Sequence, residues 1–236
     1  METLNVSTTD KIIAQACSEN RKALLESEAK LIMKEYGVAV PKFQLVTNEK
    51  EAANVAQTIG YPVVAKIVSP EIIHKSDAGG VKVGLKTATD VEAAYKTIME
   101  NAKKYDPSAH LLGVLIMEMA PQGIEVIVGA IKDPQFGATI MFGVGGIFVE
   151  VLKDVTFKIA PVTFDEAKEM INSLKSVALL KGYRSTPPAD IDALAEIIVN
   201  VSRLLMEHPE IKELDLNPVI AYAKGANTVD ARIILE

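Results

Sequence analysis

The segment around His74 has the composition of a site that could handle an anionic ligand. His74 lies in a largely polar stretch, Ser69 to Gly80, which ends in the pair Gly79 and Gly80. Glycines let a backbone approach a ligand closely, and a neutral imidazole can accept a phosphoryl group at physiological pH without prior deprotonation. A histidine in a loop is more often an ordinary surface residue. On these residues alone, a catalytic role and a plain surface position both stay open.

A second polar set lies in the motif ELDLN. A strand there would place Glu213, Asp215 and Asn217 on one face and the leucines on the other. Asp230 and Arg232 share a face in the same way on a following strand. Carboxylate and amide oxygens suit hard cations, and Mg²⁺ takes one or two protein carboxylates together with phosphates and waters. The alternative is a half-exposed hairpin with ordinary polar alternation, and the sequence does not determine the pairing register.

Three charged residues interrupt or border apolar strands. Lys66 lies inside the apolar run VVAKIV and must either reach water or meet an anion. Glu118 ends a strong strand and is followed by a proline turn, as expected for a connector between two lobes, and Glu125 opens the next strand. The alternatives are an edge-strand lysine that reaches solvent and glutamates that are simply exposed.

Other chemically suggestive residues carry weaker signals. The stretch FGVGG, residues 142–146, lacks the Lys-Ser/Thr ending of a phosphate-binding loop. A tight turn between strands at Thr139–Phe142 and Ile147–Leu152 is the simpler interpretation. His110 and His208 adjoin loop-like or helix-ending positions, so we expect both to be exposed.

Helical spacing and capping signals alternate with β-branched runs along the chain. Helices are predicted over Lys22–Tyr36, from Asn48 to Gly60, from Thr89 with Glu92 to about Tyr105, from Thr163, and over Pro188–Met206. Strands are predicted over Pro62–Val68, Gly80–Leu85, Leu111–Met117, Ile124–Ile131, Thr139–Phe142, Ile147–Leu152, Lys212–Tyr222 and Thr228–Leu235. The class is therefore α/β or α+β, with a terminal β-hairpin and a soft boundary near Leu112.

Composition excludes several classes of protein. The longest uncharged run, Pro134 to Val149, contains four glycines and is shorter than the roughly 20 apolar residues of a membrane span. The first residues include Glu2 and no apolar stretch, so no secretory signal is expected. A single Cys17 is expected to be inert and fits a reducing cytoplasm. A net charge of −6 without a basic cluster argues against nucleic-acid binding.

Five stretches together resemble the ATP-grasp β subunits of ADP-forming acetyl-CoA synthetases, in the acyl-CoA synthetase superfamily that includes succinyl-CoA synthetase. They are VVAKIVSPEIIHKSDAGGVKVGL, MEMAPQGIEVIVGAIKDPQFG, FGVGGIFVEVLKDVTFKIAPV, KGYRSTPP and ELDLNPV. The resemblance runs from about Ser27 to Glu236 and implies an α+β, ATP-grasp fold in which two α/β lobes clasp a nucleotide. The implied parts are an N-terminal segment 1–26, a lobe 27–111 with a phosphohistidine loop, and a lobe 112–236 with a metal-binding hairpin.

The resemblance also implies an activity. The family reaction is acyl-CoA + ADP + phosphate ⇌ carboxylic acid + CoA + ATP, with ATP or ADP and Mg²⁺ bound on the β subunit. A histidine on a CoA-binding α subunit takes the phosphoryl group from an acyl phosphate, and His74 matches the second carrier on the β subunit. The implied assembly is a cytoplasmic heterotetramer of two α and two β subunits.

Each implied site residue matches a position of the family pattern. At the nucleotide, Lys66 would meet the phosphates, the backbone of Glu118, Met119 and Ala120 would bind adenine, and Glu125 would lie near the ribose. Asn217 and Asp230 would bind Mg²⁺. Asp215 would orient the phosphohistidine, and Arg232 would neutralise phosphate charge. Family members often have Gly-x-Arg-Gly where this chain has Gly182-Tyr-Arg184-Ser185, so a structural role is favoured for Arg184.

Two other functions stay open at this level. A stand-alone ATP-grasp ligase that joins a carboxylate to an amine would have the same fold but would not need His74. A nucleotide-binding regulatory module could keep the fold without chemistry, although Lys66, His74, Asn217 and Asp230 are all present.

Overall fold

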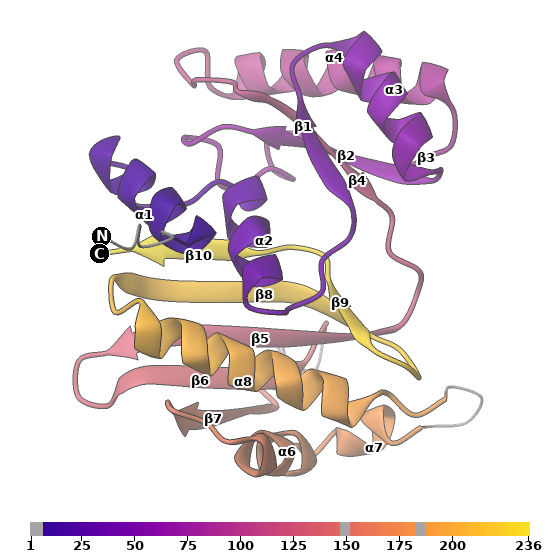
Figure 1. Cartoon of the computed structure of the whole chain (residues 1–236). Helices are drawn as coiled ribbons and strands as arrows, with labels where there is room; N and C mark the ends of the chain where they lie inside the picture. Colours follow the sequence, from indigo (N-terminus) through magenta and orange to yellow (C-terminus); the bar gives the residue numbers. More distant parts are fainter. Residues whose placement is uncertain (1–6, 147–151, 183–186) are drawn as a thin grey trace, which may run out of the picture. The chain divides into compact units, whose positions relative to one another are not determined.

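The computed structural model describes residues 7–146, 152–182 and 187–236. The chain divides into two compact units. Unit 1 contains Met1–Leu24, Glu28–Val40 and Gln122–Glu236, and unit 2 contains Leu25–Ser27 and Pro41–Pro121. Each unit combines helices with an antiparallel sheet, as Figure 1 shows, so the protein is α+β.

Unit 2 is a four-stranded sheet with two helices packed against it (Figure 1). The strand order is β1 (Phe43–Val46), β4 (Gly113–Glu118), β2 (Val63–Val68) and β3 (Val81–Leu85), and all pairs are antiparallel. The helices are α3 (Glu49–Ile59) and α4 (Ala88–Tyr105). Their apolar faces and the strands bury Ile67, Ile98 and Ile116 completely, and this burial is the main stabilising term for the unit.

The border between the units differs from the expected boundary near Leu112. β4 pairs along its whole length with β2, from Val68 opposite Gly113 to Val63 opposite Glu118. Splitting the chain at 112 would remove a central strand from the sheet, so the strand stays with unit 2 and the chain passes to unit 1 after Pro121. The assignment of the two implied lobes as functional domains stays a prediction.

Unit 1 is built on a six-stranded antiparallel sheet (Figure 1). Its order is β10 (Arg232–Leu235), β8 (Ile211–Ala221), β5 (Ile124–Asp133), β6 (Gly137–Val144) and β7 (Val155–Ile159), and β9 (Ala226–Thr228) also pairs with β8. Its helices are α1 (Thr8–Ser18), α2 (Glu26–Glu35), α6 (Phe164–Asn172), α7 (Val177–Leu180) and α8 (Ile191–Glu207). The first residues of α2 belong to unit 2 and the rest of the helix to unit 1.

Strand periodicity gives the sheet of unit 1 two different faces. In β8 the side chains of Leu214 and Leu216 are buried, whereas Glu213 and Asp215 are half-buried and Asn217 is exposed. The apolar stripe of α8 packs in the same core cluster as these leucines. The predicted alternation of ELDLN is confirmed.

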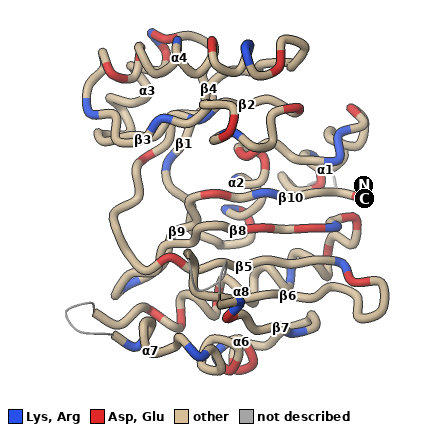
Figure 2. Tube along the Cα trace, turned by 180° about the vertical axis from the view of Figure 1, so that it is seen from behind, with Lys and Arg blue, Asp and Glu red and all other residues tan. Residues whose placement is uncertain are grey.

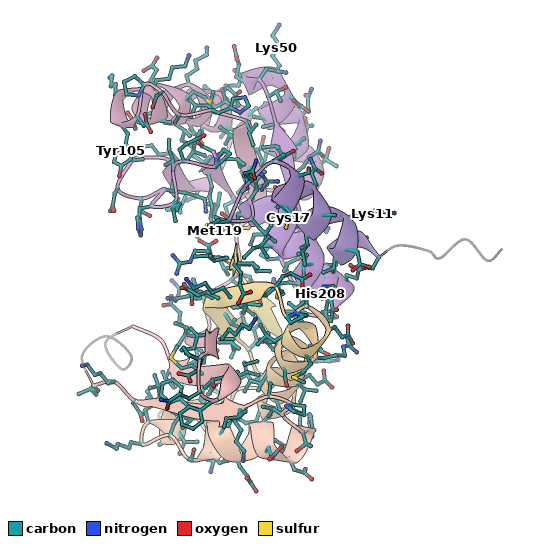
Figure 3. The ribbon with its side chains drawn as sticks, turned by 90° about the vertical axis from the view of Figure 1, so that its left-hand side faces the viewer. Lys11, Cys17, Lys50, Tyr105, Met119 and His208 are labelled. Atoms are coloured by element: carbon teal, nitrogen blue, oxygen red, sulfur yellow. The ribbon has the colours of Figure 1, made fainter. Side chains whose placement is uncertain are left out.

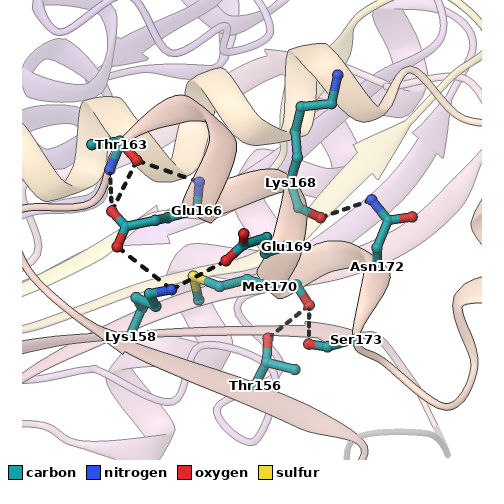
Figure 4. Close-up of polar contacts among 9 residues, drawn as sticks. All are labelled: Thr156, Lys158, Thr163, Glu166, Lys168, Glu169, Met170, Asn172 and Ser173. Atoms are coloured by element: carbon teal, nitrogen blue, oxygen red, sulfur yellow. Dashed lines mark hydrogen bonds and ion pairs between the residues drawn. The ribbon is translucent and has the colours of Figure 1, made fainter.

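Local hydrogen bonds fix α6 against the edge strand β7, as Figure 4 shows. The Thr163 hydroxyl accepts a hydrogen bond from the Glu166 amide at 3.4 Å, and the Glu166 carboxylate accepts from the Thr163 amide at 3.0 Å. Lys158 of β7 lies 3.5 Å from carboxylate oxygens of both Glu166 and Glu169. The capping box predicted at Thr163 is confirmed.

Several predicted elements differ in their ends. The helix after β3 is capped by Thr87 with Asp90, not by Thr89 with Glu92. The helix predicted from Lys22 begins at Glu26, because Leu24 donates its amide to Ile233 and Ala23 forms a bridge with Ile234. The predicted strand Thr228–Leu235 is two short strands, β9 and β10.

Other elements were missed or lie outside the described residues. The sequence patterns did not predict α1, β1 or β7. The predicted strand Ile147–Leu152 falls almost entirely outside the described residues. On the side of β6 away from β5, the paired strand is β7. Within the described ranges, no helix combines the length and apolar character that a membrane crossing requires.

Candidate functional site

The register of the C-terminal hairpin brings four of the expected site residues together in unit 1. Val219 lies opposite Thr228 in the pair of β8 and β9, and Asp215 lies opposite Arg232 in the pair of β8 and β10. Counting inward from either pair places Asn217 opposite Asp230, and the Val229 amide donates to the Pro218 carbonyl at 3.0 Å beside them. The sequence left this register open, and the structure determines it.

Asp215 and Arg232 form a cross-strand pair of opposite charge. Figure 2 shows acidic and basic positions along β8 and β10. Burial raises the pKa of Asp215 above its ordinary value, the Arg232 guanidinium lowers it, and the Asp230 carboxylate raises it. Burial therefore outweighs the cation, and the two aspartates lie close enough to influence each other.

A cavity of about 290 Å³ opens beside this pair. Its lining includes Asp215 and Arg232 with Gly129, Met141 and Phe157 from the neighbouring strands. Gly129 is the strand partner of Asp215 on β5, and a Cβ there would come within 3.2 Å of the Met141 methyl carbon. Because Gly129 has no side chain, there is room for a group to approach Asp215 over the apolar side chains of Met141 and Phe157.

A buried lysine supports the Asp230 segment, and sequence reasoning missed it. Lys30 of α2 is fully buried and donates from Nζ to the Val229 carbonyl at 2.5 Å. A signal was present, because Lys30 lies one turn after Glu26 within the apolar stripe formed by Ala29 and Met33. Charged residues inside an apolar helix face are expensive to bury and usually have a partner.

In unit 2, the loop that carries His74 is anchored on both sides while the histidine itself is exposed. Ile72 is 1% exposed and packs in the core of unit 2. Beyond His74, the Gly80 amide donates to the Lys75 carbonyl at 2.8 Å and closes a turn. The imidazole is therefore at the surface and not in an apolar core, as a phosphoryl carrier requires.

The structure gives the two glycines of this loop a packing role. Gly79 has a φ of +61°, a conformation that side chains rarely adopt, and accepts a hydrogen bond from the Asn101 side chain at 3.1 Å. A Cβ on Gly80 would lie 2.5 Å from Cγ2 of Ile67. Both glycines are therefore required for the loop to close on β2 and α4, and this requirement does not depend on a ligand.

Lys66 meets an anion, one of the two outcomes expected from its position. Its Nζ donates to Oε1 of Glu26 at 2.8 Å, and the Lys66 side chain is 8% exposed. Oε2 of Glu26 lies 2.9 Å from Nζ of Lys75, the residue after His74. Sequence reasoning missed Glu26, because the residues of the pair are 40 positions apart.

The expected connector residues lie at the end of unit 2. The Glu118 amide donates to the Lys42 carbonyl at 2.8 Å, and the Met119 amide donates to the Pro62 carbonyl at 3.2 Å. The Met119 side chain is 39% exposed (Figure 3) and Ala120 is half-buried. The amides of Glu118 and Met119 are therefore used in hydrogen bonds within the protein.

The remaining expected residues have mixed outcomes. Glu125 is exposed at the start of β5, and its carbonyl accepts from the Gly145 amide at 2.7 Å. His110 is exposed as expected, but His208 is 8% exposed, so that expectation was wrong. His208 ends α8 (Figure 3) and packs edge-on against Tyr36, with Nδ1 3.3 Å from Glu210. Arg184 lies outside the described residues.

The residues on the hairpin fit a magnesium ion whose coordination is completed by phosphate and water. Across the described parts of the chain, no three His, Cys, Asp or Glu side chains gather into a metal site. Asn217 and Asp230 supply one amide and one carboxylate, which is what Mg²⁺ takes from a protein when phosphates and water provide its other ligands.

The two antiparallel sheets and the polar hairpin define the class of protein. Residues 15–235 match the ATP-grasp domain family, so the chain belongs to that family. The expected α+β, ATP-grasp fold is confirmed.

Individual relatives narrow the comparison. The chain is 55% identical over 230 residues to the acetate–CoA ligase [ADP-forming] I subunit beta of Pyrococcus furiosus, with 98% of this chain and 99% of that one covered. It is 47% identical to a Ca. Korarchaeum cryptofilum acetyl-coenzyme A synthetase 1 solved with coenzyme A and Ca-AMPCP, with a TM-score of 0.94 over 97% of this chain and all of the other.

A second complex of the Korarchaeum enzyme has coenzyme A and Mg-AMPPCP bound, with its phosphohistidine segment pointing towards the nucleotide binding site. It is 45% identical, with a TM-score of 0.86 over 97% of this chain and all of the other. The resemblance to ADP-forming acyl-CoA synthetases is confirmed.

Proposed function

We propose that this chain is the nucleotide-binding β subunit of an ADP-forming acetyl-CoA synthetase, which catalyses acyl-CoA + ADP + phosphate ⇌ carboxylic acid + CoA + ATP. The observation that carries the proposal is the alignment of Asn217 with Asp230 and of Asp215 with Arg232 on one face of the hairpin. These residue types are what a phosphoryl-transfer site needs, since such catalysis is mostly positioning and charge compensation.

The hairpin residues divide the work at the phosphates. Asn217 and Asp230 would hold Mg²⁺, which when bound neutralises charge on the nucleotide phosphates. Arg232 would add positive charge beside them. Asp215 would accept a hydrogen bond from the imidazole N–H of the arriving phosphohistidine and so orient the nitrogen that carries the phosphoryl group. Its place beside the cavity of about 290 Å³ supports this role.

His74 would be the mobile carrier. In the direction of ATP synthesis, a ring nitrogen of His74 takes the phosphoryl group from the partner subunit's phosphohistidine. The P–N bond of His74 then breaks as a terminal β-phosphate oxygen of ADP forms the new P–O bond, and the neutral imidazole is restored. The exposure of His74 and its position in a loop support the proposal.

Other residues would hold the nucleotide. Lys66 would meet its phosphates. Adenine would be bound at Glu118, Met119 and Ala120, with the Ala120 amide as donor, and Glu125 would lie near the ribose. The exposure of Met119 supports contact with a ligand.

The name of the Pyrococcus relative, a subunit beta, implies an α partner for this chain as well. We propose that this partner is a CoA-binding α subunit, that two copies of each chain form a heterotetramer, and that the assembly is cytoplasmic. The chain alone is then expected to bind nucleotide without turning over.

Phosphate labelling of the α/β complex tests the proposal. With Mg²⁺ and ATP labelled on the γ-phosphate, His74 should gain acid-labile phosphate, and His74→Ala should abolish both the label and synthetase activity. His110→Ala, which changes another exposed histidine of unit 2, is the control and should behave as the wild type. The relay would be rejected if the wild-type β chain stayed unlabelled and the His74→Ala variant kept full activity. This is the result expected for a stand-alone ligase, which would not need His74.

A further inference from the structure

One row of side chains crosses the whole sheet of unit 1 and passes through Asp215. Along β10, β8, β5, β6 and β7 (Figure 1), each residue of the row is the strand partner of the next, in the order Arg232, Asp215, Gly129, Met141 and Phe157. Residues that are directly opposite in an antiparallel pair project from the same face, with Cβ atoms about 5 Å apart. The row therefore passes from a charged pair, through a glycine, to a thioether and an aromatic ring.

The next row on this face is largely apolar. Thr139 is the strand partner of Ile131 on one side and of Ile159 on the other. Ile131 and Ile159 are each 51% exposed and Phe157 is 60% exposed, whereas Phe142, whose side chain projects from the opposite face, is fully buried. Exposed apolar side chains that gather on one face mark a place where another group binds.

The cavity of about 290 Å³ joins the charged and apolar parts of the row. Asp215 and Arg232 line one part of it, and Met141 and Phe157 line another. Gly129 lies between the two parts, where a Cβ would come within 3.2 Å of the Met141 methyl carbon. A ligand that uses the whole cavity has a compact apolar body and a hydrogen-bond donor at its edge. Inorganic phosphate and a bare metal ion have no such body.

The imidazole of a phosphohistidine has this combination. One ring nitrogen carries the phosphoryl group, the other can donate its N–H, and the face of the ring is apolar. Thioether sulfur and aromatic side chains both make favourable contacts with an aromatic ring. Ile73, directly before His74, is 47% exposed and gives the carrier segment a second apolar group for this face of the sheet.

We propose that Met141 and Phe157 bind the ring of the phosphohistidine in this cavity, and that Gly129 leaves the space in which the ring reaches Asp215. The inference rests on the carrier role proposed above for His74. The ring N–H donates to Asp215, and the electron pair of the P–N bond stays on the other nitrogen as an oxygen of the ADP β-phosphate forms the new P–O bond. The ring keeps its N–H and leaves as neutral imidazole.

A small phosphoryl donor tests the cavity directly. In the α/β complex of His74→Gly, the carrier ring is replaced by free phosphoimidazole, and ATP formation is measured with Mg²⁺ and ADP. ATP should form and the rate should saturate with phosphoimidazole. Adding Met141→Ala or Phe157→Ala should raise the KM for phosphoimidazole about tenfold, which corresponds to about 1.4 kcal/mol of lost apolar contact. The KM for ADP should not change.

The chain offers a matched control for an exposed aromatic residue. Phe136 is 61% exposed and borders Phe157 in a neighbouring hollow, but it does not line the cavity beside Asp215. Phe136→Ala should leave the KM for phosphoimidazole unchanged. Met141→Leu, which keeps a side chain of similar size, should restore most of the affinity that Met141→Ala loses. Gly129→Val should exclude the donor, because its branched side chain occupies the space beside Asp215.

The same residues are tested with His74 in place. The β chain of the complex is labelled on His74 with ATP, the nucleotide is removed, and Mg²⁺ with ADP is added. Return of the label to ATP should be about tenfold slower in Met141→Ala and in Phe157→Ala, for the same loss of apolar contact. Both variants should bind a non-hydrolysable ATP analogue and assemble with the partner as the wild type does.

Four results would overturn the inference. The first two are absence of ATP formation from phosphoimidazole in His74→Gly and an unchanged KM in both alanine variants. Weaker binding of the ATP analogue in these variants would assign this face to the nucleotide, and loss of assembly would assign it to the partner subunit. If Met141→Ala does not fold, Phe157→Ala, a change at an exposed position of the edge strand, decides alone.

Failure of the proposed function can be told apart from failure of this inference. A wild-type complex that gains no label on His74 would refute the carrier role, and the reaction of phosphoimidazole in His74→Gly would still show whether the cavity binds the ring. Normal labelling of His74, with normal return of the label in both alanine variants, would leave the proposed function standing and refute the inference.

Discussion

Asp215 and Arg232 face each other across β8 and β10, and Asn217 faces Asp230 two residues further along the same hairpin. This arrangement places two carboxylates, an amide and a guanidinium in consecutive positions on one sheet face. These are the groups to which we assign the imidazole, phosphate and cation contacts of the proposed function. The spacing follows directly from strand periodicity once the register is set.

The first prediction concerns the metal. Asp230→Asn removes the only negative charge that we assign to the Mg²⁺ ligands, so Mg²⁺-dependent nucleotide binding should weaken by about 1 to 3 kcal/mol, the usual scale for a lost charged partner. Titration calorimetry with and without Mg²⁺ measures this. Asp165→Asn, an exposed acid at the start of α6, is the control. Unchanged Mg²⁺ dependence in Asp230→Asn would remove it from the metal ligands.

The second prediction concerns the pH dependence of stability. The pKa of Asp215 is raised above its ordinary value of 3.8, so ionisation of this group costs folding free energy. The uncharged Asp215 carboxyl stabilises the folded state fully below pH 3.8, the ordinary pKa of this group. This stabilisation is lost as the pH rises through the higher pKa that Asp215 has in the folded protein. Asp215→Asn has no carboxyl to ionise at this position, so its stability relative to the wild type should be greater at neutral pH than in acid. The variant should nevertheless be poor in phosphoryl transfer.

Denaturant unfolding of wild type and Asp215→Asn from acid to neutral pH measures the difference. The difference between the two proteins should grow in favour of the variant as the pH rises above 3.8. A constant difference would show that the carboxyl titrates normally in the folded protein.

The third prediction concerns Lys30. Lys30→Met leaves the Val229 carbonyl without its buried donor, so the free energy of unfolding should fall by about 1 to 3 kcal/mol. Mg²⁺ binding should also weaken, because Val229 directly precedes Asp230. Lys34→Met changes an exposed lysine one turn further along α2 and should alter neither quantity. A stable Lys30→Met with normal Mg²⁺ binding would contradict the supporting role.

The fourth prediction concerns Gly80. A Cβ in Gly80→Ala would lie 2.5 Å from Cγ2 of Ile67 and 3.0 Å from the Lys75 carbonyl oxygen, so the loop should not close on β2. We expect a loss of about 1 to 3 kcal/mol in stability, typical of overpacking, and a clear drop in His74 labelling. Ser76→Ala, an exposed change in the same loop, is the control. Normal labelling in Gly80→Ala would show that this closure is not needed.

The sequence predicted local features well where one strand or helix determined them. The alternation in ELDLN fixed which side chains share a face, and Asn48 and Thr163 marked helix starts that the structure has. These features depend on neighbouring residues alone.

Features that depend on distant residues were not predictable in the same way. The register of Asp230 depends on the break between β9 and β10. The partner of Lys66 is Glu26, which lies 40 positions earlier in the chain. The sequence pattern around Gly79 and Gly80 indicated close approach of a ligand, whereas in the structure closure against Ile67 and Asn101 requires both glycines. Roles of the individual site residues stay predictions that the experiments above decide.

The interleaving of the two units along the chain has a consequence for protein synthesis. All strands of unit 2 leave the ribosome before β8, which is the central partner of β5, β9 and β10. Unit 2 can therefore complete its sheet before β8 has been synthesised. During that time β5 and β6 of unit 1 lack this strand, and their apolar side chains stay uncovered. Nascent chains halted between α8 and β8 should need chaperone protection, and release of the final hairpin should end that need.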